Sequence, residues 1–198
     1  MGNEQLMQDV ANRQTVIADS HLALDSLSAY FAKLRDLTFS RATEIPLNLS
    51  SFSLRDLLNI CIGKLNPSNN KKVVVNLHPD TDITITADKI HLINIIDNLL
   101  ENAVKYSRED VHIEIDYQEQ DNDSIRISVK DNGLGISKSD SRHIFEKFYR
   151  SRAVIDKGIP GMGLGLTYVR MLVEAHRGTI RIESEQTSGS TFIIELPQ

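Results

Sequence analysis

The stretch "IIDNLLENAVKYS", from Ile95 to Ser107, decides how the rest of the chain is interpreted. Its apolar residues recur at helical spacing, yet Asn98, Asn102 and Lys105 stand among them, four and three positions apart. That spacing places the three polar side chains on one face of an α-helix. Because burying an unpaired polar group costs on the order of 1–3 kcal/mol, the pattern predicts a polar ligand lying against this face.

The segments around this helix predict the fold class. "VHIEIDYQ" and "SIRISVKD" flank one turn, and "GTIRIES" and "STFIIELP" follow a helix expected over about 163–176. Their alternation is typical of antiparallel hairpins with one solvated face. Upstream, "KKVVVNLH" and "DITIT" are predicted strands, while Ser53 and Asp88 are predicted helix caps, the first opening a helix to about Asn66. We expect an α/β protein, built as an α+β two-layer sandwich with helices on one face of a mixed, largely antiparallel sheet.

The first part of the chain predicts a separate element. Residues 3–41 contain no Gly or Pro and carry apolar residues at heptad spacing, which indicates one long coiled-coil-like helix. Such a stripe needs a partner helix, so we expect pairing with a second copy of the chain or with an upstream helix. Pro46 and "ATEIPLNLSS" are expected to form a linker. The predicted domains are a dimerisation segment over 1–45 and a main domain over 46–198.

Charge and hydropathy argue against nucleic acid and membrane as partners of this chain. The net charge is −5, and no long run of Lys and Arg occurs, which argues against nucleic acid as a ligand. No apolar run reaches the roughly 18–20 residues of a membrane span, so we expect no membrane contact by this segment. The single cysteine, Cys61, is expected to be a small core residue.

Two glycine-containing stretches indicate a nucleotide site. In "KDNGLGIS", Asp131 ends a strand, where its carboxylate could accept a hydrogen bond from the amino group of adenine; an ordinary turn is the alternative. In "GIPGMGLGLTYVR", three glycines lead directly into a helix, whose N-terminus favours phosphate; a flexible hinge is the alternative.

The loop "IFEKFYRSRAVIDKG" lies between these two stretches. It is either an ordinary surface loop or a lid over a triphosphate. The expected anchors are Phe145 and Phe148, and the cations expected to face outward are Lys147, Arg150, Arg152 and Lys157.

Taken in order, "NLLENAVKYS", "DNGLGIS", "IFEKFYR", "GMGLGL" and "SGSTFIIELP" resemble the conserved boxes of the sensor histidine kinase ATP-binding domain, which has the GHKL or Bergerat fold. The resemblance covers about Ser50 to Gln198, and several ordered boxes are more specific than any single one. It implies that the domain binds ATP and ADP with Mg²⁺ and transfers the γ-phosphoryl group to histidine.

The resemblance also implies roles for single residues. Asn102 would coordinate Mg²⁺, for which an amide oxygen is a suitable hard ligand, and Asp131 would bind adenine. The implied catalytic residues are Asn98, Lys105, Arg150 and Arg152. The implied nucleotide-binding residues are Asn98, Asn102, Lys105, Tyr106, Asp131, Gly133, Gly135, Ile136, Phe148, Lys157, Gly161, Gly163, Leu164, Gly165 and Thr191.

One position separates kinase from ATPase chemistry. The related ATPases of this fold place a Glu four residues before the metal-binding Asn, and here that position is Asn98. A neutral amide cannot accept a proton from water, so transfer to a protein side chain is favoured over hydrolysis. Glu101 is turned about 100° away from Asn102 around the helix, which makes it a poorer base.

The sequence departs from the family at the phosphoacceptor. Nothing resembles its His-Glu-x-x-Arg-Thr-Pro segment, and His21 is followed by "LALDS". The resemblance thus implies the catalytic portion of a protein-histidine kinase whose target histidine lies upstream or on another protein. It also implies a response regulator partner and a cytoplasmic position within a membrane-anchored bacterial sensor. The alternatives are a nucleotide-binding pseudokinase or scaffold and a GHKL-type ATPase.

Overall fold

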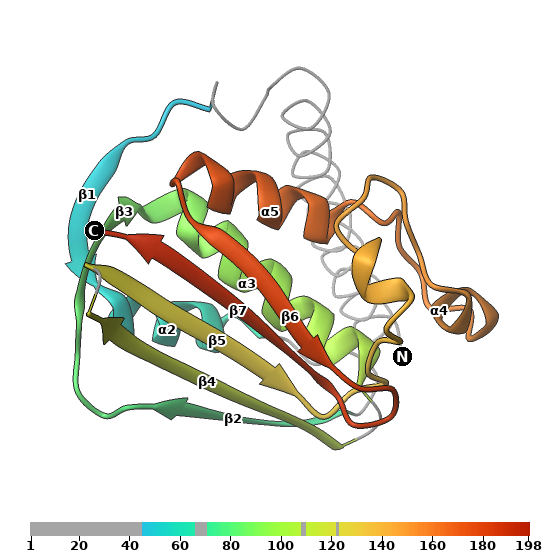
Figure 1. Cartoon of the computed structure of the whole chain (residues 1–198). Coiled ribbons are helices and arrows are strands. Elements are labelled where there is room, and N and C mark those ends of the chain that lie inside the picture. The colour runs from blue at the N-terminus through green and yellow to red at the C-terminus, as the bar shows by residue number, and fades with distance from the viewer. Residues whose placement is uncertain (1–44, 66–70, 108–109, 122) are drawn as a thin grey trace, which may run out of the picture. The chain divides into compact units, whose positions relative to one another are not determined.

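The computed structural model describes residues 45–65, 71–107, 110–121 and 123–198 (Figure 1). Five strands form one sheet in the order β2-β4-β5-β7-β6, and β1 pairs with β3 in a separate two-stranded sheet. The elements are β1 (Leu49–Ser53), α2 (Leu54–Gly63), β2 (Lys72–His78), β3 (Thr84–Asp88), α3 (Lys89–Tyr106), β4 (Asp110–Gln120), β5 (Ser124–Asp131), α4 (Arg152–Asp156), α5 (Gly165–Ala175), β6 (Thr179–Ser184) and β7 (Ser190–Pro197).

The sheet is mixed, as the sequence predicts. β2 pairs with β4 in parallel, and the other neighbouring strands in this sheet are antiparallel. Along β4, buried residues alternate with exposed ones, which is the pattern of a sheet with one solvated face. Helices α2, α3 and α5 lie together on the other face (Figure 1). The expected fold class is therefore confirmed.

The core lies between α3 and the covered face of the sheet. The six apolar α3 side chains that are at most 3% exposed are Leu92, Ile95, Ile96, Leu99, Leu100 and Ala103. Fully burying a large aliphatic side chain stabilises a fold by about 1.5–3 kcal/mol, so α3 is a major contributor. Cys61 of α2 is also in the core at 1% exposure, and burial raises the pKa of its thiol to about 12. This agrees with the expected core role of the cysteine.

Both predicted helix caps are present. Asp56 N–H donates to Ser53 Oγ at 3.0 Å at the start of α2. At the start of α3, the N–H groups of Ile90 and His91 both donate to Asp88 Oδ1 at 3.0 Å. These carboxylate and hydroxyl groups satisfy backbone donors that have no partner within the helix. Helix α2 ends at Gly63, slightly earlier than expected.

The predicted linker was assigned wrongly in its second half. Leu49–Ser53 forms β1 and pairs along its whole length with β3. Asn48 N–H also donates to Asp88 Oδ2 at 2.8 Å, so the cap of α3 fixes the start of the strand as well. The physical reason is that β3 has no partner in the five-stranded sheet, and β1 satisfies its backbone groups.

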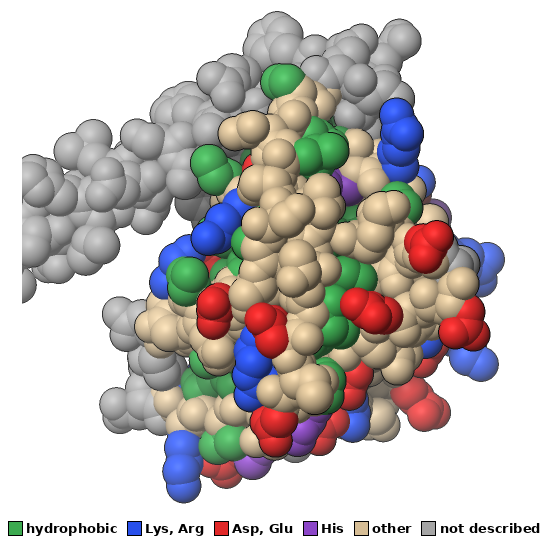
Figure 2. Space-filling view, turned by 90° about the vertical axis from the view of Figure 1, so that its left-hand side faces the viewer, with side chains coloured by type: hydrophobic (Ala, Val, Ile, Leu, Met, Phe, Trp, Pro, Cys, Tyr) green, Lys and Arg blue, Asp and Glu red, His purple; other side chains and the backbone are tan. Residues whose placement is uncertain are grey.

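The predicted long helix over 1–45 lies outside the described residues, apart from Ile45 at its end. In the part of the chain that the structure describes, no helix combines the length and apolar character needed to cross a bilayer. On the face shown in Figure 2, Asp and Glu side chains are interspersed with Lys and Arg. This face therefore offers no concentrated positive patch for a nucleic acid.

His176 links the end of α5 to the cap of α3. Its Nδ1 donates to Leu172 O at 2.7 Å, and its Nε2 accepts from Asp88 N–H at 3.0 Å. We expect His176→Phe to lower the free energy of unfolding by about 1–3 kcal/mol, because a buried backbone donor loses its acceptor. Urea denaturation measures this change. His112→Phe, at an exposed position of β4, is the control and should change stability by less than about 0.5 kcal/mol; equal effects of the two substitutions would contradict the assignment.

Candidate nucleotide-binding site

Three separated segments meet at the carboxyl end of α3 (Figure 1). Leu134 N–H, in the loop after β5, donates to Tyr106 O at 3.1 Å. From the loop before α5, a Cβ placed on Gly161 would lie only 2.6 Å from Lys105 Nζ. The structure thus brings together the end of α3, the stretch after Asp131 and the glycine-rich stretch before α5, as the sequence predicts.

Asp131 lies at this junction and is 9% exposed. Its Oδ1 accepts a hydrogen bond from Gly133 N–H at 2.7 Å. Burial raises the pKa of the Asp131 carboxyl group, and hydrogen bonds from the backbone N–H groups of Gly133 and Ser190 oppose this rise. A buried carboxylate with a raised pKa gains from a ligand that donates a hydrogen bond to it, which is what the amino group of adenine offers.

The raised pKa of Asp131 predicts how ADP binding depends on pH. In the folded protein this carboxyl takes up its proton at a higher pH than in the unfolded chain, so its contribution to the free energy of unfolding increases as pH falls. Binding should change in the opposite direction, because ADP affinity requires the ionised acceptor. As pH is lowered, we expect the affinity to begin to fall at a pH higher than 3.8, the ordinary pKa of an aspartate carboxyl group. Calorimetric titrations over a pH series test this, with Asp131→Asn as the variant that should lack the transition.

The turn between β6 and β7 supports the loop after Asp131. Thr187 N–H donates to Leu134 O at 2.8 Å. Gly189, at φ +88°, comes so close that a Cβ there would lie 1.9 Å from Asp131 O. Ile136 N–H donates to Ser184 Oγ at 2.8 Å. The sequence did not reveal this support, because it joins segments about 50 residues apart.

Two cations, Lys105 and Arg150, lie close enough at the site to repel each other. Lys105 is half-buried, and its pKa is lowered first by burial and then by the nearby Arg150 guanidinium, while Glu101 raises it. Burial also raises the pKa of the neighbouring Tyr106, with Arg150 opposing the rise. Among the described residues, Arg150 Nε is buried and has no hydrogen-bond partner. An anion such as phosphate would relieve this repulsion and supply an acceptor.

A backbone hydrogen bond joins the predicted lid to the glycine-rich stretch before α5. Phe148 N–H donates to Gly163 O at 3.0 Å. Gly163 has φ +71°, and a Cβ there would lie 2.6 Å from Tyr149 O, so this contact requires glycine. Inside the lid, Arg152–Asp156 forms the short helix α4, which the sequence analysis did not predict.

Two expectations for the lid were wrong. Phe148 is no anchor, because its side chain is 66% exposed and its backbone is left-handed at φ +65°. Arg150 does not face outward, because its guanidinium donates to Ile159 O within the lid. Instead, Tyr149 anchors the segment by donating to Asp140 Oδ1 at 2.6 Å, a bond that raises the pKa of the tyrosine to about 12.

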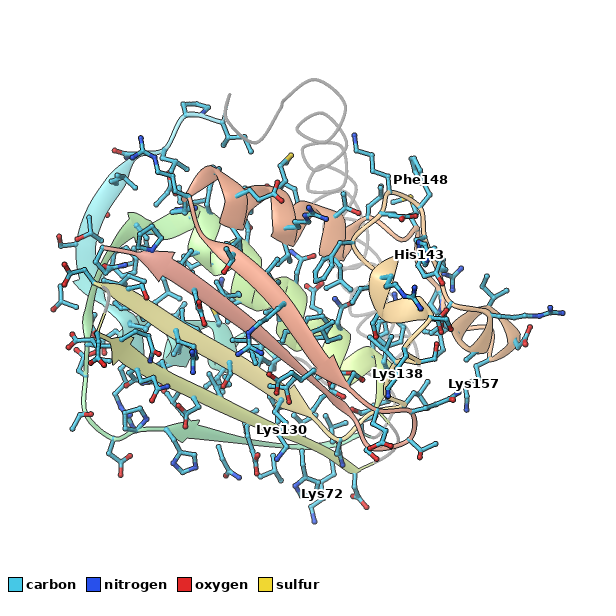
Figure 3. All side chains as sticks on the ribbon, viewed as in Figure 1. Lys72, Lys130, Lys138, His143, Phe148 and Lys157 are labelled. Carbon is cyan, nitrogen blue, oxygen red and sulfur yellow. The ribbon has the colours of Figure 1, made fainter. Side chains whose placement is uncertain are left out.

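The other lid cations are dispersed. Arg152, Lys147 and Lys157 are exposed, and Figure 3 shows Phe148 and Lys157 well apart on the lid. The structure therefore brings Arg150 to Lys105 but does not gather the remaining lid residues there. Their predicted contacts with nucleotide stay predictions.

Asn98 and Asn102 occupy different environments on α3. Asn98 is only 6% exposed, and its Nδ2 donates to Asn94 O at 2.6 Å. Its Oδ1 lies 3.2 Å from the position of a Cβ on Gly165, so it faces the first turn of α5. Asn102 lies one turn closer to Lys105 and is half-buried. Asn102 is thus the more accessible of the two amides.

The strand register separates Thr191 from Asp131. Asp131 is directly opposite Ser190, whereas Thr191 is opposite Lys130 and Glu183. Because paired residues share a face and successive residues alternate, Thr191 lies on the other face of the sheet. Ser190 is therefore the β7 residue beside Asp131, and the period of two in "SGSTF" could have identified it. Leu164 is buried at 6% exposure before α5.

The fold and the site define a nucleotide-binding domain of the Bergerat type. The family described as "Histidine kinase-, DNA gyrase B-, and HSP90-like ATPase" matches residues 87–198, more than half of the chain. The chain belongs to this family and carries its ATP-binding domain. The resemblance drawn from the sequence boxes is therefore confirmed.

Several relatives are sensor kinases. Sensor protein RprX of Bacteroides fragilis is 40% identical over 129 residues, which cover 65% of this chain and 25% of that protein. Sensor histidine kinase GacS of Pseudomonas protegens is 31% identical over 178 residues, which cover 87% of this chain and 19% of that protein. The crystal structure of full-length ShkA in complex with AMPPNP is 26% identical with a TM-score of 0.73, covering 90% of this chain and 38% of that chain. The chain spans a quarter or less of the length of these two curated relatives.

Proposed function

We propose that this chain is the catalytic portion of a sensor histidine kinase, which binds Mg-ATP and transfers the γ-phosphoryl group to a histidine on a dimerisation helix that is not evident in this chain. The observation that carries the proposal is that Asp131, Lys105 and Arg150 lie at one junction. There Asp131 would accept a hydrogen bond from the purine, and the two cations would bind phosphate. Catalysis would depend mainly on positioning and charge neutralisation.

Asn102 fits the proposed metal role. No group of three or more His, Cys, Asp or Glu in the described ranges could hold a metal ion by itself. Mg²⁺ commonly takes one or two protein oxygens and completes its shell with phosphate oxygens and water, and the half-buried Asn102 can supply such an oxygen. When bound, the ion would neutralise charge on the phosphates. Lys105 and Arg150 would bind the same phosphates through charge-assisted hydrogen bonds.

The position four residues before Asn102 supports transfer over hydrolysis. Asn98 is buried and neutral, and Glu101 is exposed. Neither provides a carboxylate fixed beside the junction to activate water. Pairing through the segment 1–45 and transfer to a response regulator are further parts of the proposal, and they depend on the family and on the sensor kinase relatives.

A phosphotransfer assay tests this function. The full chain is incubated with Mg-ATP labelled at the γ-phosphate and a helical-hairpin substrate that carries an accessible histidine. We expect acid-labile label on the substrate and none when that histidine is replaced by Gln. Release of free phosphate without label would instead indicate an ATPase. Binding of ADP without label or phosphate release would indicate a nucleotide-binding scaffold.

A further inference from the structure

We infer that Lys71 is a positioning residue for the nucleotide site: its ammonium group caps the carboxyl end of α3 and so fixes the helix turn that carries Lys105 and Tyr106. The inference rests on the proposed site and adds a residue that lies behind it.

The direct contacts of Lys71 are short and charge-assisted. Lys71 precedes β2, and its Nζ donates to Val104 O at 2.6 Å and to Ser107 O at 2.8 Å. Ser107 is the C-cap of α3, and Val104 lies in its last turn. The last carbonyl groups of a helix lack partners within it and carry partial negative charge. Lys71 supplies both the missing donors and a compensating positive charge.

The turn that Lys71 holds is shared with the rest of the site. The carbonyl of Tyr106, between the two carbonyls bound by Lys71, accepts from Leu134 N–H at 3.1 Å. Lys105 Nζ lies 5.3 Å from the centre of the Tyr106 ring. A movement of this turn would therefore displace the phosphate-binding ammonium and the loop after Asp131 together.

The neighbouring residue provides a matched control. Lys72, the first residue of β2, is exposed and lies at the lower edge of the view in Figure 3. Replacing Lys72 by Met removes the same charge one residue away from the cap. Calorimetric titration of the full chain with ADP and Mg²⁺ compares the variants. We expect Lys71→Met to weaken ADP binding about tenfold or more and Lys71→Arg to stay within about threefold of wild type, with Lys72→Met unchanged.

Amide hydrogen exchange separates positioning from general stability. In Lys71→Met, exchange should accelerate in the last turn of α3, over 103–106, and stay unchanged over 92–99. A folded Lys71→Met protein that binds ADP with the wild-type Kd would overturn the inference. If Lys71→Met does not fold, Lys71→Gln, which keeps a neutral donor, should bind ADP with intermediate affinity, and wild-type affinity would overturn the inference. Absence of ADP binding by the wild-type chain would instead reject the nucleotide site itself.

Discussion

Asp131→Asn should weaken ADP binding by about 10- to 100-fold, because a charge-assisted hydrogen bond contributes about 1.5–3 kcal/mol. The fold should persist, since an amide oxygen can still accept from Gly133 N–H as Oδ1 does. In wild type, ADP at a thousand times its Kd should add about 4 kcal/mol to stability, and at the same ADP concentration the variant should lose about 1.4–2.7 kcal/mol of this gain.

Thermal denaturation with and without ADP measures this difference. Asp116→Asn is the matched control, because Asp116 is an exposed aspartate of β4. It should respond to ADP as wild type does. A full response in Asp131→Asn would remove this residue from the site.

Asn102→Ala should reduce phosphotransfer at least about 100-fold, because the variant loses the proposed protein ligand of Mg²⁺ and with it several kcal/mol of charge stabilisation in the transition state. ADP binding without Mg²⁺ should remain close to wild type, since the purine and cationic parts of the site are intact. The dependence of ADP affinity on Mg²⁺ concentration should therefore largely disappear.

Phosphotransfer assays and ADP titrations at several Mg²⁺ concentrations check this prediction. Asn76→Ala, at an exposed position of β2, serves as the control and should keep both activities. Equal Mg²⁺ dependence in wild type and Asn102→Ala would show that another group holds the ion.

Much of the fold was predictable from local patterns. The β4–β5 and β6–β7 hairpins follow from alternation of apolar and polar residues, and the caps at Ser53 and Asp88 follow from hydrogen-bonding chemistry within three residues. Strand β1 was missed because its residues are mostly exposed and its pairing with β3 depends on a distant segment. Local sequence carries no information about such a partner.

The meeting of the segments that form the candidate site was predictable from the sequence. Asp131, Lys105 and the stretch before α5 do meet, because each stands at the end of an element that the sequence pattern identifies. The side-chain directions in the lid were not predictable. Arg150 turns inward to Ile159 O, and Phe148 stays exposed, because the backbone contact with Gly163 sets the path of the loop. That contact joins residues 15 apart without a periodic pattern.

We propose that adenine nucleotide binds where α3, the loop after β5 and the loop before α5 meet. Amide NMR spectra of the full chain titrated with Mg-ADP test it most directly. We expect the chemical-shift changes to concentrate at 102–107, 131–136 and 161–167, and Mg-GDP at equal concentration to produce much smaller changes. Shift changes confined to other segments, or equal changes with both nucleotides, would contradict it.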